Sequence, residues 1–160
     1  MPIVSLRYRF RQDFGVPARP AFEWATDYAP DDGRLFSRKT RRSVERISDD
    51  AFILTDLTYP EGRARRIRRL VRVDPKQMAW TNTHLDGPFR NSQFWYRIVP
   101  DGRGACHLDF EGFLLEKVRR RLSPAQAARR AELNRRHDAA EWRRFLGPAL
   151  EAEVRARRGR

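Results

Sequence analysis

The chain has 160 residues, enough for one domain whose buried core needs neither disulfides nor metal ions to hold it together. Its 34 lysines and arginines outnumber its 21 acids, for a formal net charge of +13. The single cysteine, Cys106, excludes an internal disulfide and a cysteine-based metal cluster. No run reaches the roughly 18 apolar residues of a membrane span, and the N-terminus lacks the pattern of an export signal. We therefore expect one cytoplasmic domain over residues 1–160.

The N-terminal segment alternates apolar and polar residues from Val4 to Phe10. A period of two predicts a strand with one face buried and the other in water. Gly15 and Pro17 end this strand. The residues that follow predict a short helix starting at Pro20, with Trp24 and Tyr28 one turn apart on its apolar side.

The middle of the chain is divided by turn residues into six further segments, as in an antiparallel meander. The clearest hairpin signal is the loop of proline, aspartate and glycines at residues 100–104. The segments predicted as strands are Leu35 to Ile47, Ala51 to Tyr59, Arg63 to Val73, Met78 to His84, Phe89 to Val99 and Ala105 to Leu115.

The last quarter of the chain predicts one long amphipathic helix. Ser123 followed by proline is a good helix start, and apolar residues then recur at spacings of three and four through Glu153. Gly147 and Pro148 should kink or interrupt the helix, because proline removes a hydrogen bond and clashes with the preceding turn, and we expect a bend there. We expect the basic tail over residues 153–160 to fray.

One strand, short helices, six strands and a long helix predict an α+β fold, in which a curved seven-stranded antiparallel sheet wraps around the C-terminal helix. This order resembles the helix-grip fold of the START-like superfamily, also called SRPBCC, which includes polyketide cyclases and dehydrases and lipid-transport domains. The local similarities are PARPAFEWATDYAPDD and YRIVPDGRGACHLDFEG, and one departure is the pair Cys106 and His107, where a small hydroxyl residue is expected. The resemblance implies a cavity between sheet and helix, and no particular reaction.

The acids Asp27, Asp31 and Asp32 lie beside Trp24 and Tyr28. One interpretation is that these acids cap or orient the turn before the second strand while the aromatics close one mouth of the cavity. The other is acid catalysis. We favour the first, because an acid/base pair needs opposed positions across a substrate and separated pKa values, which neighbours in sequence do not provide.

Trp80, Asn82 and His84 alternate along one predicted strand and should point into one space. His84 is the candidate catalytic residue, as a proton carrier, with a structural histidine as the alternative. Arg69 lies within a strand, and if it faces inward it needs a carboxylate partner and becomes a polar anchor for a ligand.

The other two histidines, His107 and His137, have no partners at metal-ligand spacing, so we expect no metal and no cofactor. The aromatic positions of the late strands and the final helix suit a cavity wall or a core. The predicted ligand-binding residues are Trp24, Tyr28, Arg69, Trp80, Asn82, His84, Phe94, Tyr96, Phe110 and Trp142.

Three functions remain open. The first is binding or carriage of a hydrophobic or amphipathic small molecule. The second is a cyclase or dehydrase type of enzyme acting on a polyketide-like or aromatic substrate. The third is binding of a polyanion, RNA or an anionic membrane, through the arginine-rich surface. The identity of the ligand, the presence of catalysis and the oligomeric state do not follow from the sequence.

Overall fold

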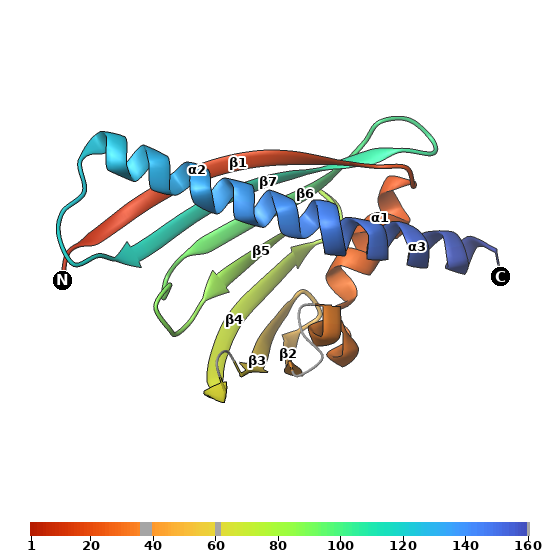
Figure 1. Ribbon diagram of the computed structural model, residues 1–160. Coiled ribbons are helices and arrows are strands. Elements are labelled where there is room, and N and C mark those ends of the chain that lie inside the picture. Colours follow the sequence, from red (N-terminus) through yellow and green to blue (C-terminus); the bar gives the residue numbers. More distant parts are fainter. Residues whose placement is uncertain (36–39, 60–61, 160) are drawn as a thin grey trace.

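The computed structural model describes residues 1–35, 40–59 and 62–159 (Figure 1). Its helices and strands follow the predicted order, which confirms the α+β fold class. The elements are β1 (Ile3–Phe14), α1 (Ala18–Asp27), the 3-10 helix η1 (Pro30–Leu35), β2 (Arg41–Ser48), β3 (Ala51–Thr58), β4 (Arg65–Asp74), β5 (Ala79–His84), β6 (Gln93–Pro100), β7 (Cys106–Lys117), α2 (Pro124–Glu141), the π-helical turn η3 (Trp142–Leu146) and α3 (Gly147–Arg158).

The seven strands form one antiparallel sheet in the order β1-β7-β6-β5-β4-β3-β2. Strands adjacent in sequence are adjacent in the sheet, except that β1 pairs with the last strand. In β1, Leu6 and Tyr8 are buried whereas Arg7 and Arg9 are exposed, as the alternating sequence predicts.

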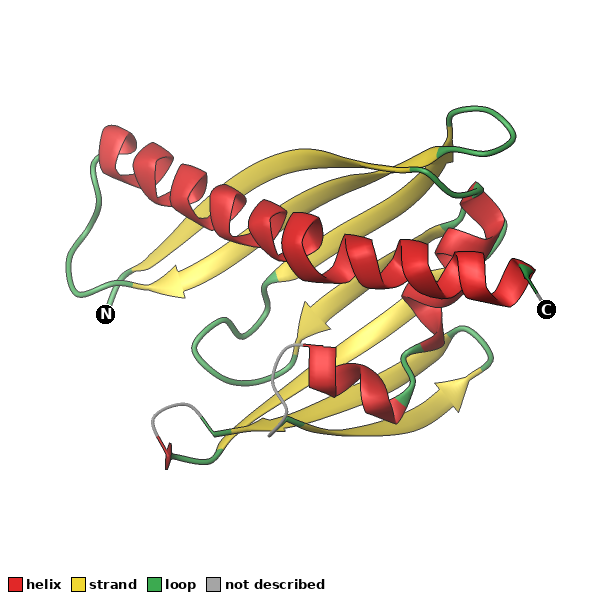
Figure 2. Cartoon of the chain, turned by 45° about the vertical axis from the view of Figure 1, so that its right-hand side comes forward, coloured by secondary structure: helices red, strands yellow, loops and turns green. Residues whose placement is uncertain are grey.

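The helical segment α2, η3 and α3 crosses one face of the sheet (Figure 2). Its first part packs against β1, while α1 packs against α3 and β6. In both ribbon views β2, β3 and β4 lie away from the long helix (Figures 1 and 2). Ser123 starts α2 as predicted, because its side chain accepts a hydrogen bond from the Gln126 amide and the Gln126 side chain accepts one from the Ser123 amide.

The α-helix is interrupted directly before Gly147 and Pro148, one of the two outcomes that these residues predict. The chain stays helical through a π turn, in which the Gly147 amide donates to the carbonyl of Trp142. Pro148 then stands in the first turn of α3, where a missing amide hydrogen costs little. In the structure α3 continues to Arg158, with Val154 buried and Arg157 paired with acids.

Two predicted strands begin later than expected. Leu35 belongs to η1 rather than to β2, and residues 36–39 of that predicted strand lie outside the described residues, as do positions 60 and 61 of the turn that follows β3. The strand expected from Phe89 begins at Gln93, because Asn91 adopts a left-handed backbone conformation with φ of 68° within a turn.

The core lies between one face of the sheet, where β1 and β3 to β7 contribute buried side chains, helix α1 and the end of the long helix. Its fully buried side chains include Leu6, Ile98, Leu108, Leu150 and Val154. Within the described residues, no helix is both long and apolar enough to cross a membrane.

We predict that Gly112→Ala destabilises the fold. Gly112 of β7 faces Tyr8 of β1, and a β-carbon at this glycine would lie 2.7 Å from Cζ of the buried Tyr8 ring. Forcing such a ring aside typically costs about 1–3 kcal/mol. Urea unfolding measures the change, and Gly104→Ala is the matched control, because no atom lies within 4 Å of its added carbon. Equal stabilities for the two variants would contradict the prediction.

Candidate functional site

A cavity of about 490 Å³ lies between the sheet and the long helix, within the usual size range of small-molecule sites. All ten predicted ligand-binding residues line it, although their binding of a ligand stays a prediction. The lining side chains that the sequence did not single out for binding are Tyr8, Ala25, Asp32, Leu35, Arg42, Phe89, Leu114, Asn134, His137, Asp138, Glu141 and Leu146.

Aromatic side chains from neighbouring strands form the sheet side of the cavity. The register pairs Trp80 with Tyr96 and Tyr96 with Phe110. The Trp80 and Tyr96 rings stack with centroids 4.8 Å apart, and Tyr96 meets Phe110 edge-on at 5.1 Å. Such contacts fix the ring orientations, so this wall is preorganised for an apolar ligand.

The end of α1 forms a second wall. Tyr28 terminates this helix in a left-handed conformation with φ of 42°, and its ring meets Phe52 edge-on at 5.2 Å. Of the nearby acids, Asp27 pairs with Arg157, whereas Asp32 is half-buried and lines the cavity. Burial, together with the neighbouring Asp27, raises the pKa of Asp32 to about 6.

A buried ion network holds the β2–β4 side of the cavity. Asp56 accepts hydrogen bonds of 2.7 and 2.9 Å from Arg42 and a further one from Arg69. The Arg42 and Asp56 side chains are only 3% and 7% exposed. Burial alone would raise the pKa of Asp56, but the hydrogen bonds and charges of the two arginines outweigh it and lower the pKa. Arg69 thus has the carboxylate partner that an inward arginine requires.

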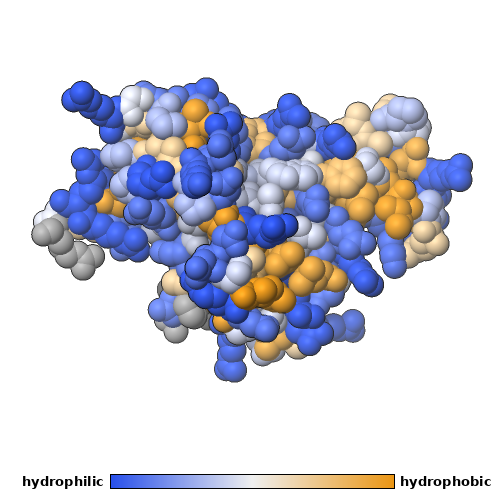
Figure 3. All heavy atoms as spheres, turned by 180° about the vertical axis from the view of Figure 1, so that it is seen from behind, coloured by the Kyte–Doolittle hydropathy of each residue, from blue (hydrophilic) through white to orange (hydrophobic). Residues whose placement is uncertain are grey.

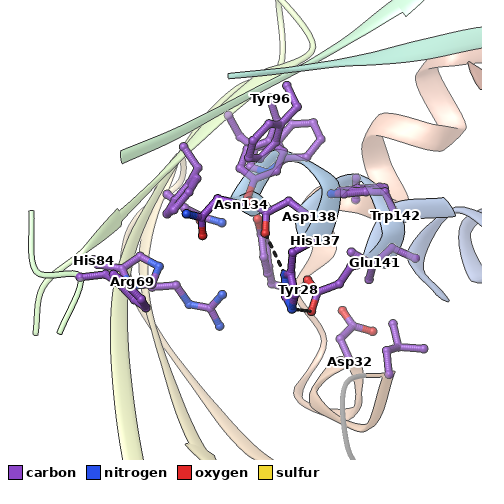
Figure 4. A pocket seen from close by; sticks show the side chains of 18 of the residues that line it. Tyr28, Asp32, Arg69, His84, Tyr96, Asn134, His137, Asp138, Glu141 and Trp142 are labelled. Carbon is purple, nitrogen blue, oxygen red and sulfur yellow. Dashed lines mark hydrogen bonds and ion pairs between the residues drawn. The ribbon is translucent and has the colours of Figure 1, made fainter. Parts of the chain in front are cut away.

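The helix contributes a polar wall that sequence reasoning did not assign to binding. The Tyr8 hydroxyl donates a 2.6 Å hydrogen bond to Asp138, and burial and this carboxylate raise the pKa of Tyr8. Burial also raises the pKa of Glu141. Asn134, Asp138 and Glu141 point into the cavity from one side of the helix (Figure 4). Their spacing of four and three residues is the signal that could have found them.

His84 lies on the opposite side of the cavity from Glu141 (Figure 4). Its ring lies 5.4 Å from Phe94 and 6.5 Å from Phe89, and its register partner on β4 is Arg69. Burial and the Arg69 charge lower the pKa of His84 to about 4, so the ring is neutral at pH 7. A neutral ring can both donate and accept a hydrogen bond to a ligand.

Two groups of potential metal ligands come together in space, although no spacing in the sequence predicted them. In one, Nδ1 of His107 donates a 2.7 Å hydrogen bond to the Asp101 carboxylate, near Asp13 and outside the cavity. Arg11 pairs with both of these acids. The other consists of His137, Asp138 and Glu141 on the helix. The prediction of no metal is not tested by this arrangement.

Comparison of the chain with protein-family models found no match. No curated protein matches at the level of sequence either. Solved structures share the fold. The Zhui aromatase/cyclase from a Streptomyces species has a TM-score of 0.72 at 12% identity, with 98% of this chain and 97% of that chain covered.

Norcoclaurine synthase from Thalictrum flavum, solved with dopamine and hydroxybenzaldehyde, has a TM-score of 0.70 at 12% identity over 95% of this chain and 87% of that one. A START superfamily protein from Mycobacterium smegmatis has a TM-score of 0.61 at 12% identity over 86% and 95% of the two chains. Sequence identities this low establish only that these proteins share a fold. The chain has the START-like helix-grip fold, as its sequence predicts.

We predict that Asp56→Leu is strongly destabilising. The substitution leaves the Arg42 guanidinium, only 3% exposed, without its carboxylate. Breaking a buried pair in this way costs about 3–5 kcal/mol in unfolding free energy, which urea titration measures. The control is Glu111→Gln, which breaks the exposed Arg9–Glu111 pair and should cost less than about 1 kcal/mol. A cost below about 1 kcal/mol for Asp56→Leu as well would show that the buried network contributes little to the stability of the fold.

We predict that His84 makes the fold less stable in mild acid. Unfolded His84 takes up a proton below pH 6.5, whereas the folded form stays neutral until about pH 4. Stability therefore falls as the pH drops through this window, by about 2 kcal/mol between pH 7 and pH 5. His84→Phe should remove this part of the loss in urea unfolding. His137→Gln, at a side chain 70% exposed, should retain it. Identical pH dependence in wild type and His84→Phe would refute the assignment.

Proposed function

We propose that the protein binds or carries a hydrophobic or amphipathic small molecule in the cavity between sheet and helix. The observation that carries this proposal is the cavity of about 490 Å³ with a stacked aromatic wall. A protein interior is normally packed with few voids larger than a water molecule. A cavity of this size with an aromatic wall, in a chain of 160 residues, is therefore best explained by an occupant.

The distribution of polar groups supports an amphipathic occupant. Trp80, Tyr96 and Phe110 offer an apolar surface on the sheet, whereas Arg69 and Glu141 reach into the cavity from opposite walls (Figure 4). A ligand with an apolar body and one or two polar groups matches this arrangement. The body displaces water from the aromatic rings, and the polar groups fix the orientation of the ligand.

A second candidate is an enzyme of the cyclase or dehydrase type, acting on a polyketide-like or aromatic substrate. The observation that favours it is a set of titratable groups on opposite walls: His84, with a lowered pKa, faces Glu141, with a raised one. Separated pKa values on opposed sides suit proton transfer across a bound molecule. The aromatase/cyclase and norcoclaurine synthase of the same fold are consistent with this reading. Chemical conversion of a bound ligand, followed by mass spectrometry, distinguishes an enzyme from a carrier.

Polyanion binding has less support. Several arginines of the long helix are already paired with glutamates one turn away, as in Arg136 with Glu132 and Arg157 with Glu153. Seen from behind, hydrophilic side chains are spread over the surface among hydrophobic ones (Figure 3). Recognition of RNA normally needs basic residues gathered on one face with aromatic platforms among them.

We predict that Nile red, a neutral apolar dye, binds the protein with increased fluorescence and that Ala25→Phe weakens this binding at least tenfold. Ala25 lines the cavity from α1, so a phenyl ring there occupies the space of the ligand. Ala156→Phe on the exposed side of α3 is the control and should leave binding unchanged. Native mass spectrometry of the purified protein tests for a retained ligand. Dye binding that is equal in both variants would place the dye elsewhere and remove the main support for the proposal.

A further inference from the structure

Two buried polar atoms on the sheet side of the cavity lack a hydrogen-bond partner among the described residues. They are Oδ1 of Asn82, an acceptor, and Nε of Arg69, a donor. Asn82 is 95% buried and lines the cavity together with Arg69. Buried polar groups in proteins are almost always paired, so two unpaired ones in the wall of one cavity indicate a missing partner.

The register of the sheet brings these two side chains together. Val71 of β4 is opposite Asn82 of β5, and Arg69 is opposite His84. Arg69 and Asn82 are therefore diagonal neighbours on adjacent strands and share the concave face. Diagonal neighbours in a sheet lie about 7–8 Å apart, a separation that one bridging ligand group can span.

Other polar atoms of the two side chains lie beside neighbouring polar groups. A terminal nitrogen of Arg69 donates to Asp56. The Asn82 amide lies close enough to Tyr28 and Tyr96 to moderate the rise in pKa that burial causes in both tyrosines. The two buried atoms without a partner thus offer a ligand one donor and one acceptor.

The charges around the cavity disfavour an anionic ligand. Arg42 and Arg69 share the carboxylate of Asp56. Three further acids, Asp32, Asp138 and Glu141, line the same cavity. A carboxylate entering it would add a negative charge to a site that already holds four acids against two arginines.

We propose that Asn82 and Arg69 form a subsite for a hydroxyl group, so that the cavity selects an uncharged alcohol or phenol with an apolar body. A hydroxyl donates to Oδ1 of Asn82 and accepts from Nε of Arg69 at the same time. A carboxylate only accepts, an ammonium only donates and faces a guanidinium, and a hydrocarbon leaves both atoms unpaired. This inference rests on the proposed function and narrows the class of its ligand.

The experiment compares three probes of one shape, naphthalene, 2-naphthol and 2-naphthoate, by their displacement of Nile red from the wild-type protein. We expect 2-naphthol to bind about tenfold more tightly than naphthalene, because it satisfies both buried atoms. We expect 2-naphthoate to bind more weakly than 2-naphthol. Naphthalene binding measures the apolar contribution alone.

The variant Asn82→Leu tests the residue, since leucine has nearly the same shape and no polar atom. It should abolish the roughly tenfold preference for 2-naphthol over naphthalene, because the acceptor that distinguishes the two probes is gone. The matched control is Thr83→Val, at the next residue of β5, whose side chain points to the other face of the sheet and does not line the cavity. This control should keep the preference for the hydroxyl.

The two proposals fail in different ways. If Nile red binds but naphthalene and 2-naphthol bind equally, or 2-naphthoate binds most tightly, the hydroxyl subsite is wrong and the apolar ligand site stands. If neither the dye nor any probe binds, both are wrong. The order of the three probe affinities for the wild-type protein tests the hydroxyl subsite even if Asn82→Leu does not fold.

Discussion

The concave face of the sheet is wider than the helix that packs against it. The helix covers the β1 side, where Tyr8 bonds to Asp138, and reaches the core through Leu150. No comparable element covers β3 and β4 in the part of the chain that the structure describes. Aromatic rings and charged side chains line the gap instead, and these two kinds of residue give the cavity an apolar wall and a polar one.

The buried ion network in this gap explains why the side chains around the cavity do not close over it. Asp56 is tied to arginines on both neighbouring strands, Arg42 on β2 and Arg69 on β4. Moving either arginine out of place would leave a buried charge without its partner, which is more costly than leaving a void. The network therefore fixes the side chains of the β2–β4 wall, and it also positions Arg69 beside Asn82.

The alternation of side-chain direction along strands was sufficient to predict many residues that line the cavity. Trp80, Asn82 and His84 share a face because every second residue of a strand does, and the resemblance in strand order indicated that this face borders a cavity. The acids of the helix could not be assigned in this way, since the side on which Glu141 lies depends on how the helix rotates against β1. Phe89 was placed in a strand because the left-handed turn at Asn91 leaves no mark in the hydrophobic pattern.

The π turn connects the cavity wall to the core. Trp142 and Leu146 line the cavity, whereas Leu150 and Val154 are buried in the core, each four residues after the last. In an α-helix, four residues turn about 40° past a full circle, so three such steps would carry Val154 well away from the side of Trp142. The wider turn rotates the chain less per residue and offsets part of this drift. Gly147 makes it possible, since a β-carbon there would lie 2.7 Å from the Trp142 carbonyl oxygen. The glycine and proline that predicted a bend therefore mark a change of helical phase, which keeps one side of the helix directed at both the cavity and the core.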